Sequence, residues 1–125
     1  VDIGYRKIAV TVAGFRAKEI SEVRSFADSV GIRPLIFSIC NTCVEGEDAT
    51  HLLKADVVCA SASRIVREKV GSKAIMQLGV AIPVFVLTQE GKRIILEYLL
   101  SFKDEIVVFR DQLPYLVPSR EPVLK

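Results

Sequence analysis

The sequence lacks the features that would place it in a membrane or on a nucleic acid. Its longest nearly apolar run, 78–87, is interrupted by Gly79 and Pro83 and is far shorter than the roughly 20 apolar residues a membrane-spanning helix needs. There is no signal-peptide pattern and no lipidation motif. Basic residues are scattered, and 17 Lys and Arg against 15 Asp and Glu give a net charge of only +2. We therefore expect neither membrane nor nucleic acid among its partners.

Cysteine is also scarce. The 125 residues contain three cysteines, an odd number, and two of them form the motif Cys40-x-x-Cys43. This is not the disulfide framework of a small secreted domain. The cysteine content indicates a reducing, cytoplasmic compartment.

What the sequence does contain is a large share of apolar residues. Half of the chain is apolar and the mean hydropathy is +0.36, which is high for one free-standing domain of this size. The chain begins with Val1, and Gly4 stands shortly before an apolar stretch, as glycine does after a helix that has ended. We expect the C-terminal piece of a longer protein, with its N-terminal half missing.

Strand-like and helix-like segments alternate along residues 1–110. The strands are expected at 7–13, 34–40, 56–60, 74–78, 83–87 and 106–109, and the helices at 17–30, 47–54, 61–70 and 89–102. Such alternation predicts an α/β fold, a three-layer Rossmann-like domain with a mostly parallel sheet and helices on both faces. The connection 78–82 is too short for a parallel crossover, so its flanking strands would be antiparallel or lie in different sheets.

Small and polar residues gather where the expected parallel strands end, which is where open α/β sheets bind ligands. These candidate ligand-binding residues are Gly14, Asn41, Thr42, Ser61, Ser63, Arg64 and Thr88. Hydroxyls, free N–H groups and a guanidinium at a helix start suit a small anionic metabolite or cofactor. The plainer alternative is that the serines and Thr88 only cap helices. The first turn lacks the three glycines of a dinucleotide fingerprint, so the identity of any cofactor stays open.

The three cysteines form a second candidate site. Cys40, Cys43 and Cys59 follow or end neighbouring strands, and His51 lies between them in the sequence. Three thiols and an imidazole suit zinc or an iron–sulfur cluster. The alternatives are a redox dithiol and simple packing, because free cysteine is among the most buried residues.

Several stretches resemble a known family. They are 4–12 (GYRKIAVTV), 47–49 (EDA), 55–63 (ADVVCASAS) and 82–88 (IPVFVLT). In this order they resemble the C-terminal half of the archaeal family called methanogenesis marker protein 8. The resemblance implies an archaeal cytoplasmic origin, a link to methanogenic metabolism and an absent N-terminal half. It supplies no catalytic residues, so it does not decide whether the protein is an enzyme.

Two functions therefore remain open at this stage. One is a domain that binds a small anionic metabolite or cofactor, and the other is a non-enzymatic assembly factor that handles a metal or cluster through its cysteines. The tail 111–125 combines apolar residues with Pro114, Pro118 and Pro122, so it must lie on an apolar surface. That surface belongs to its own domain, to the missing half or to a second copy. The surplus of apolar residues predicts a homo-oligomer.

Overall fold

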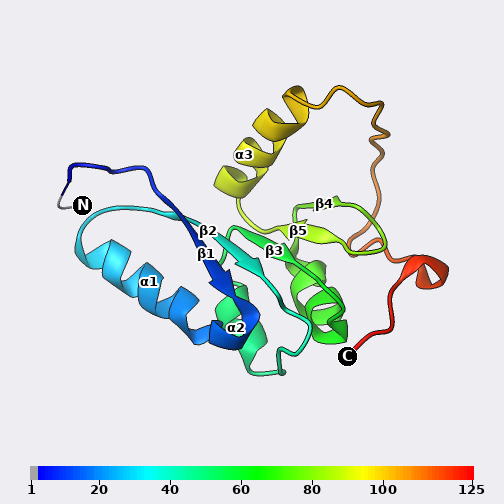
Figure 1. Ribbon diagram of the computed structural model, residues 1–125, viewed down its shortest axis with the longest axis horizontal. Coiled ribbons are helices and arrows are strands. Elements are labelled where there is room, and N and C mark those ends of the chain that lie inside the picture. The colour runs from blue at the N-terminus through cyan, green and yellow to red at the C-terminus, as the bar shows by residue number, and fades with distance from the viewer. Residues whose placement is uncertain (1–2) are drawn as a thin grey trace.

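The computed structural model describes residues 3–125 and shows one five-stranded sheet with helices packed mainly on one side (Figure 1). The strands are β1 (Ala9–Ala13), β2 (Leu35–Ile39), β3 (Val57–Cys59), β4 (Met76–Leu78) and β5 (Val84–Val86), in the spatial order β1-β2-β3-β5-β4. Val1 and Asp2, which contributed to the expectation of a preceding helix, lie outside the described residues. Gly4 has a positive φ of +87°, and the preceding helix stays a prediction.

The predicted mostly parallel sheet is wrong, because the sheet is mixed. β1 pairs with β2 and β2 with β3 in parallel, but β5 pairs with both β3 and β4 antiparallel. The short connection 79–83 closes a hairpin between β4 and β5, as its length required. The hairpin places β5 between β3 and β4 and reverses the direction of the sheet there.

The predicted three-layer arrangement is also wrong. α1 (Lys18–Ser29), α2 (Asp48–Leu52) and the π-helical segment Val66–Val70 pack on the same face of the sheet. One core cluster contains residues of these three helices and of four strands: Val12, Ile20, Ile36, Leu52, Val58, Val66, Val70 and Phe85. The opposite face has no such helical layer in the described chain. The first turn of α3 (Gln89–Leu100) packs on it, with Gly91 close to Val57, and the helix then projects away from the sheet (Figure 1).

Local sequence signals predicted most of the helices and strands correctly. Gly31 ends α1 with a φ of +68°, and Thr88 caps α3 by accepting a hydrogen bond from the N–H of Gly91 at 3.1 Å. The strand expected at 106–109 is wrong, because this segment is irregular and its side chains are exposed. No helix within residues 3–125 is long and apolar enough to cross a membrane.

The tail 111–125 lies on its own domain. The side chain of Gln77 in β4 donates to the carbonyl of Tyr115 at 2.8 Å and accepts from its N–H at 2.9 Å. At the far end of the tail, Lys125 pairs with the backbone of Ala62 and Arg64 at 2.8 and 2.9 Å. These contacts hold the tail on the domain that carries it, which is one of the three surfaces considered.

Candidate ligand site at the ends of β2 and β3

The carboxyl ends of β2 and β3 are tied together by one buried side chain, Asn41. Its Oδ1 accepts from the hydroxyl of Ser38 at 2.9 Å, and its Nδ2 donates to the carbonyl of Cys59 at 2.7 Å. Its backbone N–H donates to Oγ of Ser61 at 3.1 Å. Asn41 is fully buried, so its polar atoms are committed to the protein. The residue positions the two strand ends and does not itself face a ligand.

Two residues at the carboxyl ends of β2 and β3 have left-handed backbone conformations. Cys40 follows β2 with a φ of +56°, and Ser61 follows β3 with a φ of +50°. A non-glycine residue in this region costs of order 1 kcal/mol or more, and such residues cluster where function requires a particular geometry. The strain at both strand ends marks this edge of the sheet as a candidate site.

Gly14 was predicted to contact a ligand. Instead, its lack of a side chain leaves the space that Asn41 occupies. A Cβ on Gly14 would lie 2.4 Å from Oδ1 of Asn41 and 2.8 Å from a methyl carbon of Val44. The glycine is buried against these side chains and offers no open surface. Its function here is close packing.

At the helix start after β3, the N–H groups of three consecutive residues already have acceptors. Those of Ala62, Ser63 and Arg64 donate to Oγ1 of Thr42, the carbonyl of Ala60 and the carbonyl of Lys125 at 3.4, 3.0 and 2.9 Å. The N–H of Val66 donates to Oγ of Ser63 at 3.2 Å. Ser63 is therefore a buried helix cap, which is the plainer of its two predicted roles. Arg64 remains exposed beside it.

Thr88 is not part of this site. Because β5 is antiparallel to β3, the end of β5 lies beside the start of β3 rather than beside its end. There the hydroxyl of Thr88 donates to Oδ1 of Asp56 at 2.6 Å. The sequence placed Thr88 with the other candidates because a parallel β5 was assumed.

Arg67 is the residue at this edge that sequence reasoning missed. It is 1% exposed, and it donates from Nη1 to the carbonyls of Ser61 and Ser63 and from Nη2 to that of Ala81. Within residues 3–125 its Nε has no hydrogen-bond partner, and the nearest carboxylate is Glu121 of the tail at 3.5 Å. Burial lowers the pKa of Arg67, while Glu121 and Cys59 act in the opposite direction. The sequence signal that could have identified Arg67 is its position one helical turn before Val70, which is buried.

Within residues 3–125, the three cysteines are not gathered into a group that could hold a metal ion. Cys40 and Cys43 are exposed and Cys59 is half-buried, with its Sγ 3.9 Å from Oγ of Ser61. Among the described residues, no group of three His, Cys, Asp or Glu side chains lies close enough to hold a metal ion. The ring nitrogen Nδ1 of His51 lies 2.7 Å from the hydroxyl of Ser21 on α1.

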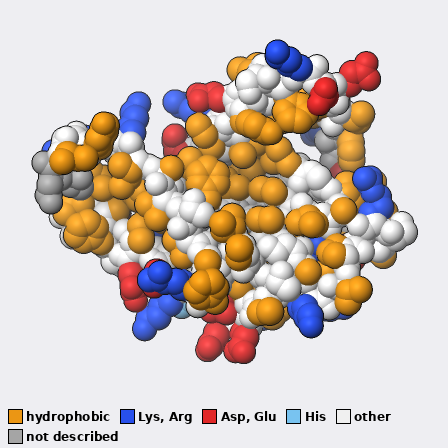
Figure 2. Space-filling view, viewed as in Figure 1, with side chains coloured by type: hydrophobic (Ala, Val, Ile, Leu, Met, Phe, Trp, Pro, Cys, Tyr) orange, Lys and Arg blue, Asp and Glu red, His pale blue; other side chains and the backbone are white. Residues whose placement is uncertain are grey.

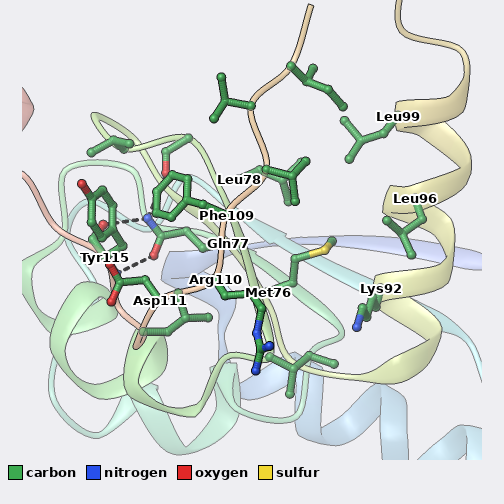
Figure 3. A pocket seen from close by; sticks show the side chains of 17 residues that line it. Met76, Gln77, Leu78, Lys92, Leu96, Leu99, Phe109, Arg110, Asp111 and Tyr115 are labelled. Atoms are coloured by element: carbon green, nitrogen blue, oxygen red, sulfur yellow. Dashed lines mark hydrogen bonds between the residues drawn. The ribbon is translucent and has the colours of Figure 1, made fainter.

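A separate cavity of about 770 Å³ lies between β4, α3 and the segment 106–115. Figure 3 shows Met76 and Leu78 of β4 on one side of it and Leu96 and Leu99 of α3 on the other. Its polar groups, among them Lys92, Arg110 and Asp111, lie at the margins of a mainly apolar lining. This cavity is mainly apolar, whereas the site at the ends of β2 and β3 is polar. The two therefore suit different ligands.

Comparison with known proteins places this chain in a family context. Residues 1–100 match the family described as "Uncharacterized protein conserved in archaea (DUF2099)". The "Uncharacterized protein MJ0054" of Methanocaldococcus jannaschii is 35% identical over 118 residues, which cover 93% of this chain and 40% of that relative. No solved structure matches the chain. These matches confirm an archaeal family; the name methanogenesis marker protein 8 and the C-terminal position stay predictions.

Proposed function

The chain belongs to the uncharacterised archaeal family DUF2099, and we propose that it binds a small anionic metabolite or cofactor at the ends of β2 and β3. The observation that carries this proposal is Arg67, a buried cation at that edge whose Nε lacks a hydrogen-bond partner among the described residues. A buried charge is costly unless it is paired and hydrogen-bonded. The site therefore favours an anion next to Nε.

Glu121 takes the place of that anion in this form of the chain. Its carboxylate is 3.5 Å from Nε of Arg67, too long for a strong hydrogen bond, and it belongs to the tail. A ligand carboxylate or phosphate has oxygens that accept strong, charge-assisted hydrogen bonds from a guanidinium. We infer that ligand binding displaces the tail around Glu121, which also releases the N–H of Arg64 from Lys125.

Side chains around this position supply further contacts. Thr42 and Ser61 are partly exposed at the two strand ends, and Arg64 is exposed at the start of the helix. Together they offer two hydroxyls and a second guanidinium at this edge of the sheet. The left-handed conformations of Cys40 and Ser61 support the proposal, because they show that the strand ends are held in an unfavourable geometry.

The test is anion binding by variants of the tail carboxylate. Glu121→Gln removes the charge that competes for Arg67, and Glu97→Gln removes an exposed charge from α3 as a matched control. Inorganic phosphate, citrate and adenosine nucleotides are added to each variant, and the melting temperature and dissociation constant are measured. We expect Glu121→Gln to bind one of these anions about tenfold more tightly than the parent chain, a difference of about 1.4 kcal/mol. Absence of binding to all of them, or equal gains in both variants, contradicts the proposal.

The cellular context is part of the proposal. A role in the methanogenic metabolism of the archaeal cytoplasm is supported by the four stretches that resemble methanogenesis marker protein 8 and by the archaeal family. Deletion of the gene in a methanogen, followed by measurement of methane formation, tests that link. Growth and methane formation unchanged from the parent strain would contradict it.

A second candidate is an assembly factor that handles a metal or cluster, favoured by the exposure of both Cys40 and Cys43. Because the described residues hold no group of three metal-binding side chains, further ligands must come from outside this chain. Anaerobic purification of the longer protein with metal analysis tests this function. A metal content that Cys40→Ser and Cys43→Ser leave unchanged would refute it.

A further inference from the structure

We propose that the side of the sheet opposite the helical core is the docking surface for the part of the longer family protein that lies outside this chain. We call this surface the open face; its central residues are Leu35, Phe37 and Ile39 of β2 and Val84 of β5. Figure 2 shows hydrophobic side chains gathered over β2, β3 and β5 on the face in view, next to α3. The occupant is expected to be an equally apolar surface of the same polypeptide.

The sequence of β2 is apolar on both faces of the sheet. Successive residues of β2 alternate between faces, so Ile36 and Ser38 face the core while Leu35, Phe37 and Ile39 face the other way. The open face thus carries three of the four apolar side chains of this strand, of which Leu35 and Phe37 are half-buried and Ile39 is 43% exposed. A strand that is apolar on both sides is typical of a sheet covered on both sides.

α3 gives a second, independent indication. Its first turn packs tightly on β3, since a Cβ on Gly91 would lie 2.6 Å from the carbonyl oxygen of Asp56. Beyond that turn, apolar side chains point in several directions; Ile95 and Leu99 are half-buried, and the others are exposed, with Leu100 at 86%. A helix that is apolar around most of its surface is normally buried. The projecting part of α3 is therefore expected to be embedded in the missing partner surface.

The edge of the sheet gives a third indication. β1 is an edge strand with the sequence AVTVA, which contains no charge and no proline to prevent another strand from pairing with it. The segment that leads into it exposes Ile3, Tyr5 and Ile8. An unprotected edge beside exposed apolar residues is expected to be covered in the complete protein.

The extent of these surfaces favours the remainder of the chain over a second copy. The open face, the projecting α3 and the β1 edge face different directions, whereas a two-fold dimer buries a single self-complementary patch. This chain spans 40% of the length of its Methanocaldococcus jannaschii relative, so more than half of that relative is available to cover them.

Cysteine accessibility tests the proposal. Ile39→Cys is introduced into this chain and at the aligned position of the M. jannaschii relative, in both cases with Cys40→Ser and Cys43→Ser. Leu100→Cys serves as a second variant whose substitution at an exposed position leaves folding intact, and Glu22→Cys on exposed α1 is the control. Alkylation by iodoacetamide is followed by mass spectrometry. We expect Ile39→Cys and Leu100→Cys to react about tenfold more slowly, or slower still, in the longer protein, and Glu22→Cys to react equally in both.

Two results would overturn the proposal. Equal alkylation of Ile39→Cys and Leu100→Cys in the two proteins would show that the remainder of the chain does not cover these surfaces. Slow alkylation already in the isolated chain, with a sedimentation mass of about twice 13.8 kDa, would assign the open face to a second copy instead.

Discussion

Arg24 of α1 donates from Nη2 to Oδ2 of Asp56 across 2.6 Å, which joins the helical layer to the start of β3. The same carboxylate accepts from the N–H of Ile36 in β2 at 2.7 Å and from the hydroxyl of Thr88 at 2.6 Å. Asp56 is fully buried, so its charge is compensated entirely within the protein. One carboxylate thereby connects α1, β2, β3 and the start of α3.

Asp56→Ala is expected to lower the free energy of unfolding by about 3–5 kcal/mol, because it leaves the partly buried Arg24 and two other donors without their acceptor. Arg33→Gln is the control, since Arg33 is 60% exposed and 3.6 Å from Asp56, and it should cost under about 1 kcal/mol. Urea denaturation measures both. Similar losses for the two variants would show that the buried network does not stabilise the fold.

Gly14→Ala is expected to destabilise the chain by about 1–3 kcal/mol, because the added methyl group meets Asn41 and Val44 at overlapping distances. Gly46→Ala is the matched control: its Cβ would approach only the flexible end of Lys69, at 3.3 Å, so the change should be about 0.5 kcal/mol or less. Thermal unfolding distinguishes them. A Gly14→Ala variant as stable as the parent would contradict the packing role assigned to this glycine.

Cys40→Gly is expected to stabilise the chain by up to about 1 kcal/mol, because glycine removes the cost of a left-handed backbone and loses part of this gain through its greater freedom when unfolded. Cys43, also exposed, does not have a positive φ. Cys43→Gly should therefore lose about 0.5–1 kcal/mol. Chemical denaturation under reducing conditions compares the two, and an equal loss in both would show that the backbone at position 40 is not strained.

Gln77→Ala is expected to loosen the tail, because the amide of Gln77 makes both hydrogen bonds that hold the backbone of Tyr115 to β4. The loss should be about 1–3 kcal/mol, and trypsin should cleave after Arg120 faster than in the parent chain. Gln112→Ala changes an exposed glutamine in the same tail and should leave the cleavage rate unchanged. Equal rates in all three proteins would contradict a tail held through Gln77.

Much of the secondary structure could be predicted because its signals act over a few residues. Thr88 caps α3 and Gly31 ends α1, as the sequence indicated, through contacts within one helical turn. The segment 106–109 shows the limit of such signals. Its β-branched residues favour an extended chain, but a strand also needs a neighbour to bond, and no strand of the described sheet lies along it.

The location of the candidate site stays a prediction. The sequence placed it at the ends of β2 and β3, where the structure joins Asn41 to Ser61. It missed Arg67, because the burial of this side chain depends on Ala81 and Glu121, which approach from distant parts of the chain. It wrongly included Thr88, because the direction of β5 was unknown.

The sequence by itself therefore determined five of the six expected strands, the approximate positions of the helices and the α/β class, since caps, turns and side-chain periodicity depend on neighbouring residues. Only the tertiary structure decided that β5 enters the sheet antiparallel between β3 and β4, that α1, α2 and the segment Val66–Val70 cover one face, and that Arg67 faces Glu121. These features depend on contacts between segments far apart in the chain. Each is selected by the total burial and hydrogen bonding of the whole fold, which no single local pattern specifies.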